Sequence, residues 1–186
     1  MTEPYDGNPA NVDAWSAAVF ARLQAWPVAM GGAWTRWSPG YLVLTVKEFD
    51  GRSVDPIFLD TGNDELTVTF GYWECHLDGP DHPGAQDNLA SSSAEAIRLI
   101  EDWLAGRICT AVYYSADDKW CGTVTIDPDQ IPQQLAGSLE WLSKSGPTRI
   151  ELRTPERAHW RFFRIQHDGA ITETTCEQSK LGAGSA

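Results

Sequence analysis

The sequence predicts an α+β fold in a single domain, with a largely antiparallel, curved sheet that carries two or three helices packed on one face. Three observations support this prediction. The chain of 186 residues is 42% hydrophobic and 11% aromatic, unlike disordered sequences. Apolar residues recur at helical spacing in some segments, and β-rich segments joined by short turns occupy most of the others, which favours antiparallel pairing. We expect one domain over residues 1–186, with loose ends at about 1–8 and 179–186.

The first predicted helix covers residues 11–26. Its apolar residues follow one another at steps of four, four and three, which places them on one side of an amphipathic helix. Pro27 should end this helix, because proline is poorly tolerated inside a helix. The inward side consists of Trp15, Val19, Leu23 and Trp26.

Two more helices are predicted further along the chain. In the segment 91–106, Ser92 and Glu95 have the spacing of a capping box, and Gly106 supplies a C-terminal stop. A third helix is expected at about 130–143, where leucines recur at helical spacing.

Segments of β-branched, aliphatic and aromatic residues predict the strands. One long strand is expected over 65–77, and its alternation would point Cys75 and His76 to opposite faces. The segments 108–115 and 119–126 flank a short polar linker and are expected to form a hairpin. The other predicted strands cover residues 41–47, 56–60, 148–152, 157–165 and 170–174.

The acidic residues are unevenly distributed. The formal net charge is −12, and between Glu48 and Asp87 ten acids stand against one base, Arg52. Such a charge repels nucleic acid and anionic membranes and attracts a basic partner. The alternative is that the acidity merely keeps the protein soluble.

The composition also predicts a cellular location. The longest apolar runs are shorter than the roughly 20 residues that cross a bilayer, and the N-terminus lacks a basic segment followed by an apolar one. The four cysteines are far apart and form no C-x-x-C pair, which suits reduced thiols. We therefore expect a cytoplasmic protein that contacts neither nucleic acid nor membrane.

The stretch GYWECHLDGPDHPG, residues 71–84, holds the strongest chemical candidates. A metal site there would need His76, Asp78 and His82 together with a ligand from elsewhere, and their spacing matches no known zinc or calcium pattern. We expect no metal and no cofactor, and we interpret the stretch as the end of a strand followed by a polar loop.

Other catalytic patterns are weak. The chain has no G-x-S-x-G elbow, and Cys109 and Cys121 are expected to be structural thiols in the predicted hairpin. Five arginines within sixteen residues could bind phosphate, but the acids of the other half of the chain offer internal partners. These arginines are Arg149, Arg153, Arg157, Arg161 and Arg164.

The block DELTVTFGYWECHLD, the helix AEAIRLIEDWLAGR and the hairpin ICTAVYYSADDKWCGT, in this order, cover about residues 64–123. Together they resemble small acidic α+β proteins of bacterial toxin-immunity systems. The resemblance implies a non-enzymatic inhibitor that binds a cognate toxin, without indicating which residues make contact.

Two classes of function follow from these observations. The first is a non-enzymatic binding protein, in one form an immunity protein that neutralises a basic bacterial toxin through an acidic surface. The second is a hydrolase or small-ligand-binding protein with a pocket near His76, Asp78 and His82. The candidate partner-binding residues lie in predicted turns and in the glycine-bearing loop 30–40, and they are Asp60, Asp64, Asp78, Asp81, Trp34 and Trp37.

Overall fold

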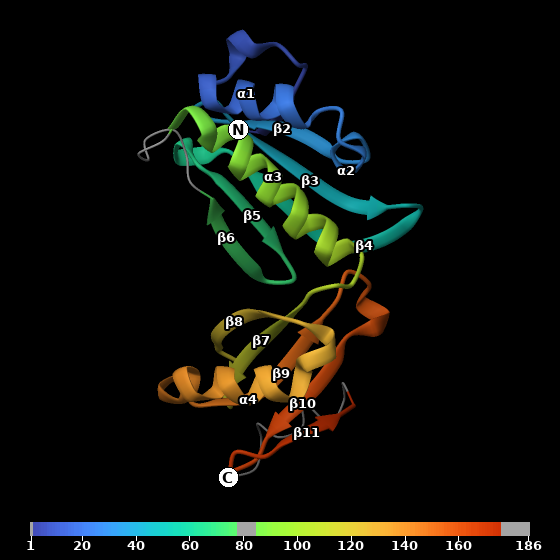
Figure 1. Ribbon diagram of the computed structural model, residues 1–186, viewed down its shortest axis with the longest axis vertical. Coiled ribbons are helices and arrows are strands. Elements are labelled where there is room, and N and C mark those ends of the chain that lie inside the picture. The colour runs from blue at the N-terminus through green and yellow to red at the C-terminus, as the bar shows by residue number, and fades with distance from the viewer. Residues whose placement is uncertain (1, 78–84, 176–186) are drawn as a thin grey trace. The chain divides into compact units, whose positions relative to one another are not determined.

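The computed structural model describes residues 2–77 and 85–175 (Figure 1). The chain has an α+β fold, as predicted, but its strands form two antiparallel sheets, of six and five strands, where one sheet was expected. It divides into two compact units. The first comprises Met1–Phe70 and Glu74–Leu104, and the second comprises Gly71–Trp73 and Ala105–Ala186. Within the described ranges, every helix is too short or too polar to span a lipid bilayer.

The sheet of the first unit is a meander, because its strands follow one another across the sheet in chain order. The edge strand β1 arises from the N-terminal stretch that was expected to be loose, and it pairs with β2. The strand β2 occupies the segment expected to be a glycine-bearing loop. The six strands are β1 (Thr2–Pro4), β2 (Ala33–Trp37), β3 (Tyr41–Phe49), β4 (Arg52–Asp60), β5 (Leu66–Phe70) and β6 (Trp73–Leu77).

Three helices belong to the first unit: α1 (Ala14–Leu23), α2 (Pro27–Met30) and α3 (Ala85–Leu104). Figure 1 shows α1 and α3 lying on one face of the sheet. The predicted inward side of the first helix is confirmed for Trp15, Val19 and Leu23. Because α1 ends at Leu23, Trp26 lies beyond it and Pro27 does not end it. Pro27 stands at the first position of α2, where a missing backbone N–H is tolerated. The buried residues of the predicted stripe are Trp15, Val19, Leu23 and Trp26.

The capping box predicted for the second helix is wrong. The helix α3 begins at Ala85, so Ser92 and Ser93 lie within it and are buried. Their small side chains continue the side of the helix that also buries Ile100 and Trp103. Beyond the other end, Gly106 has a positive φ of 69°, as the predicted C-terminal stop requires.

The predicted long strand over 65–77 is in fact a hairpin of β5 and β6. Gly71 and Tyr72 form a two-residue turn with φ values of 53° and 72°, the pattern of a type I′ turn. Because this turn reverses the chain, the alternation does not run through it. His76 therefore shares a face with Thr67 and not with the buried Leu66.

The second unit contains the sheet ordered β11-β10-β9-β7-β8, and α4 packs against β8. The third predicted helix is confirmed, with Leu135 and Leu142 buried. The strand expected over 157–165 is shorter, since Arg157–His159 forms a 3₁₀ turn before it. The elements are β7 (Cys109–Ser115), β8 (Trp120–Ile126), α4 (Ile131–Leu142), β9 (Pro147–Arg153), β10 (Arg161–Ile165) and β11 (Ile171–Thr174).

The predicted hairpin of the second unit is confirmed as β7 and β8. Cys109 lies opposite Ile126, as its expected register requires. Near the turn the register shifts between Tyr113 and Tyr114, so Cys121 does not lie opposite Tyr114 as expected. This bulge adds one residue to β8 immediately before Gly122.

Gly122→Ala is expected to lower the free energy of unfolding by about 1–3 kcal/mol, the usual cost of overpacking. A Cβ atom at Gly122 would lie 2.7 Å from Cδ2 of Leu142, and that leucine is 4% exposed. Gly137→Ala in α4 is the control, because a Cβ there meets nothing within 4 Å. It should stabilise the helix by about 1 kcal/mol. Urea unfolding of both variants measures their free energies of unfolding. Equal stability of the two variants would contradict the close packing of α4 on β8.

Candidate functional site

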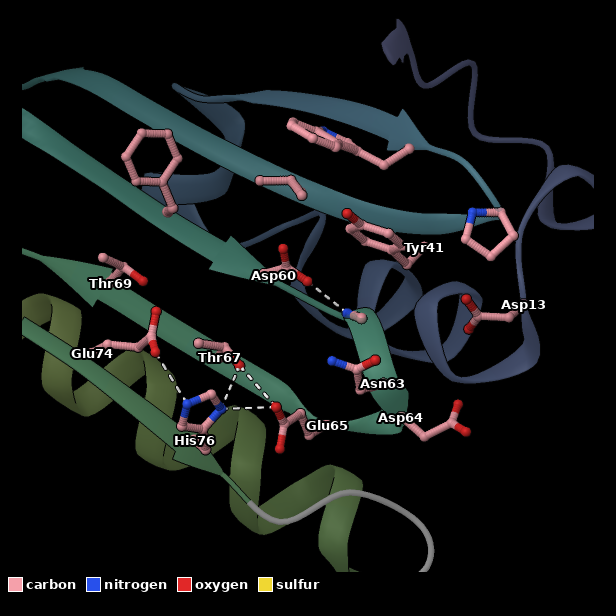
Figure 2. A pocket seen from close by; sticks show the side chains of 15 residues that line it. Asp13, Tyr41, Asp60, Asn63, Asp64, Glu65, Thr67, Thr69, Glu74 and His76 are labelled. Carbon is pink, nitrogen blue, oxygen red and sulfur yellow. Dashed lines mark hydrogen bonds and ion pairs between the residues drawn. The ribbon is translucent and has the colours of Figure 1, made fainter. Parts of the chain in front are cut away.

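The sheet of the first unit is hollowed on the face opposite α1 and α3. The hollow has a volume of about 730 Å³, and Figure 2 shows its side chains. We call it the acidic hollow, because five carboxylates line it and no Lys or Arg stands among its described lining residues. The lining residues are Asp13, Trp37, Pro39, Tyr41, Val43, Phe58, Asp60, Gly62, Asn63, Asp64, Glu65, Thr67, Thr69, Glu74 and His76.

Strand alternation places these side chains. In the antiparallel register Val43, Asp60 and Thr67 lie side by side on β3, β4 and β5. Phe58 and Thr69 form the next such pair. The intervening residues of these strands point toward the helices and are buried, so one face of the sheet forms the core and the other forms the hollow. The buried set on these three strands includes Leu42, Leu44, Ile57, Leu59, Leu66, Val68 and Phe70.

Asp13 reaches the hollow from the start of α1. Its Oδ1 accepts a hydrogen bond from the backbone N–H of Ser16 at 2.7 Å, so the carboxylate caps the helix. The Ser16 hydroxyl in turn lies 2.5 Å from the hydroxyl of Thr61, just after β4. Ser16 and Thr61 are 0% and 1% exposed, so these buried hydrogen bonds fix Asp13 relative to the sheet.

Asp60 is the half-buried acid of the hollow. Its Oδ1 accepts a hydrogen bond from the N–H of Gly62 at 2.6 Å. Burial raises the pKa of Asp60, and the charges of Glu65 and Glu74 raise it further, while the Gly62 hydrogen bond lowers it. The carboxylates therefore repel one another, and a cation entering the hollow would relieve that repulsion.

His76 stands between two carboxylates (Figure 2). Its Nδ1 lies 2.7 Å from Oε1 of Glu65 and 3.1 Å from Oγ1 of Thr67, and its Nε2 lies 3.1 Å from Oε1 of Glu74. The hydrogen bond to Glu65 raises the pKa of His76 above its usual value. Partial burial opposes this shift, and the charges of Glu65 and Glu74 reinforce it. The side chain is 57% exposed and accessible to a ligand.

Aromatic side chains line the side of the hollow away from His76. Trp37 is 42% exposed and stacks on Tyr41, with ring centroids 6.1 Å apart. Phe58 is 38% exposed. These faces can contact both apolar groups and cations.

The structure brings together only some of the residues predicted from the sequence. Asp60, Asp64, Trp37 and His76 line the acidic hollow. Trp34 does not, because it lies on the other face of β2, where its ring packs edge-on against Phe20 at 5.3 Å. The predicted residues Asp78, Asp81 and His82 lie outside the described residues.

Asp13, Glu65 and Glu74 line the hollow but were not among the site residues predicted from the sequence. Asp13 precedes a helical apolar stripe, which identifies it as an N-cap but not as a neighbour of β4. Gly71, inside an apparent strand, was the available signal for a turn that brings Glu65 to His76.

The three thiols in the described part of the chain are poorly suited to nucleophilic catalysis. Burial raises the pKa of Cys109 to about 11 and also raises the pKa values of Cys75 and Cys121, which disfavours the reactive thiolate. In the parts of the chain that the structure describes, no group of three or more His, Cys, Asp or Glu residues is arranged to hold a metal ion.

Three arginines of the second unit, Arg149, Arg153 and Arg161, have acidic partners within that unit. Arg149 and Arg153 both pair with Glu151, and Arg161 pairs with Glu173 at 2.8 Å. Arg149 also lies over the ring of Tyr114, 4.2 Å from its centroid. The internal pairing expected from the sequence is therefore present for Arg149, Arg153 and Arg161, but their partner acids belong to the same half of the chain and not to the acidic half.

Comparisons of the chain with profiles of protein families, with curated proteins and with solved structures found no match.

Proposed function

We propose that this protein is a non-enzymatic binding protein that holds a basic protein partner in the acidic hollow. The observation that carries the proposal is the concentration of five carboxylates in one hollow without a Lys or Arg among its described lining residues. Acids clustered at a concave surface create a negative potential that attracts and orients a basic partner. An immunity protein that neutralises a basic bacterial toxin is the form of this function implied by the resemblance over residues 64–123.

The aromatic side of the hollow supports a protein partner. Trp37 and Phe58 expose large apolar surfaces next to Asp60, and protein interfaces are rich in such aromatic residues. A lysine or arginine chain could place its aliphatic part on these rings and its charge on the acids. Solubility alone would require neither the concave shape nor the adjacent aromatic residues.

A second candidate function is the binding of a small cationic ligand at the same place. The volume of about 730 Å³ lies within the usual range of small-molecule sites. His76 lines this space, whereas Asp78 and His82, the other residues named for such a pocket, lie outside the described residues.

The test uses two triple variants that remove the same number of charges. Asp64→Asn, Glu65→Gln and Glu74→Gln change the acidic hollow without altering Asp13 or Asp60, whose carboxylates bond to backbone N–H groups. The control variant carries the changes Asp117→Asn, Asp129→Asn and Asp168→Asn in the second unit, at positions that are exposed to solvent.

Binding of a fluorescent oligolysine peptide is expected to weaken about tenfold or more in the hollow variant at low salt, with a flatter salt dependence. The control variant should bind nearly as the unmodified protein does. Stopped-flow association across a salt series measures both. If both variants lose the same affinity for oligolysine, binding depends only on the net charge of the protein, and the proposed site is wrong. Tighter binding of spermidine than of oligolysine would favour the small-ligand function.

A further inference from the structure

The contacts of His76 require a particular protonation state. Both ring nitrogens lie within hydrogen-bonding distance of a carboxylate oxygen, on Glu65 and on Glu74. A carboxylate can only accept hydrogen bonds, and a neutral imidazole has only one N–H to donate. The observed geometry therefore suits the imidazolium, which donates from both nitrogens.

The described side chains that contact His76 are acidic or neutral. Glu65 and Thr67 approach it from the start of β5, and Glu74 approaches it along its own strand, β6. Asp60 on β4 lines the same hollow and interacts electrostatically with both glutamates. Among the described lining residues, His76 is thus the one side chain that can carry positive charge.

We propose that the imidazolium of His76 is an internal counter-cation for Glu65 and Glu74, and that a lysine or arginine side chain of the partner displaces it. This inference rests on the proposed function and names the group that the hollow binds. An ammonium or guanidinium group can donate to both carboxylates in place of the ring. Once displaced, the ring loses the partners that favoured its charge, so partner binding and loss of the His76 proton are coupled.

The coupling has a defined sign. The pKa of His76 is raised in the free protein, so the protonated ring is favoured there above the usual value of about 6.5. Below this pKa the partner must expel the imidazolium, and binding is weak. As the pH rises through the pKa of His76, the competing proton leaves and binding strengthens.

The experiment compares the oligolysine affinity of the unmodified protein, His76→Gln and the control His159→Gln from about pH 5.5 to 8.5. His159 is also exposed, but it lies in the second unit. In the unmodified protein and in the control, affinity should rise with pH by up to about tenfold per unit below the pKa of His76. In His76→Gln the rise should be clearly shallower, with only the carboxylates contributing. Calorimetry in two buffers of different ionisation enthalpy should show clearly more proton release in the unmodified protein and in His159→Gln than in His76→Gln.

The outcomes separate this inference from the proposed function. If oligolysine binds to the hollow but His76→Gln keeps the pH profile of the unmodified protein, the inference is wrong and the proposed function stands. If oligolysine fails to bind the unmodified protein at every pH, both are wrong. Because the side chain of His76 is more than half exposed, the variant should fold normally, and circular dichroism checks this.

Discussion

Replacing Trp103 by alanine is expected to lower the free energy of unfolding by about 3–5 kcal/mol, the range found for large aromatic residues removed from a core. Trp103 is 0% exposed and stacks on Phe70 at a centroid distance of 4.9 Å. It therefore joins α3 to the helix-facing side of β5. Its removal would leave a cavity between these two elements that neighbouring side chains can fill only in part.

The control for Trp103 is Trp141→Ala in α4. Trp141 is 60% exposed, so its removal should cost well under half as much. Chemical denaturation of the two variants measures the difference. Similar losses would mean that α3 does not pack on the sheet through Trp103.

Replacing Glu151 by alanine is expected to cost about 3–5 kcal/mol, because it leaves two arginines without their shared carboxylate in a partly buried setting. The side chains of Arg149, Glu151 and Arg153 are only 11%, 12% and 13% exposed. Arg149 retains its bond to Asp118, whereas Arg153 retains only neutral partners among its described contacts.

Glu173→Ala provides the matched control, since it removes the carboxylate of an exposed pair with Arg161. Exposed ion pairs contribute about 0–1 kcal/mol, so this variant should remain close to the unmodified protein. Chemical denaturation at low and high salt measures the free energy of unfolding of both variants, Glu151→Ala and Glu173→Ala. If Glu151→Ala is as stable as Glu173→Ala, the network of Arg149, Glu151 and Arg153 does not stabilise the second unit.

The parts of the fold that the sequence predicted correctly are those with strong local periodicity. Trp15, Val19 and Leu23 define one side of α1 whatever lies against it, and the β-rich segment of β3 is equally clear. The start of α3 was not predictable in this way. Ser92 and Ser93 are typical of helix caps, but both lie inside the helix and are buried there, which no local pattern predicts.

The candidate site depended on one turn. If residues 65–77 formed a continuous strand, Glu65 and His76 would be about 36 Å apart. In the hairpin their side chains meet at 2.7 Å. Gly71 indicated a possible break, but Tyr72 is an aromatic residue typical of strands and concealed the turn. To predict that Asp60 and Asp64 line a hollow, one would also need the register of three strands and the position of α1. Neither can be read from a local sequence pattern.

One face of β4 and β5 forms the core and the other lines the hollow. If the hollow binds a partner as proposed, this separation affects how the choice of partner could change in evolution. Leu66 and Val68 are 0% exposed and stabilise the fold, while Phe58, Thr67 and Thr69 alternate with buried neighbours and face the hollow. If the proposed binding holds, substitutions at these outward positions should alter recognition while leaving the packed layer beneath them unchanged. Under the proposed function, specificity could then diverge without loss of stability, and a combinatorial library at these three positions would be a source of variants that bind other basic partners.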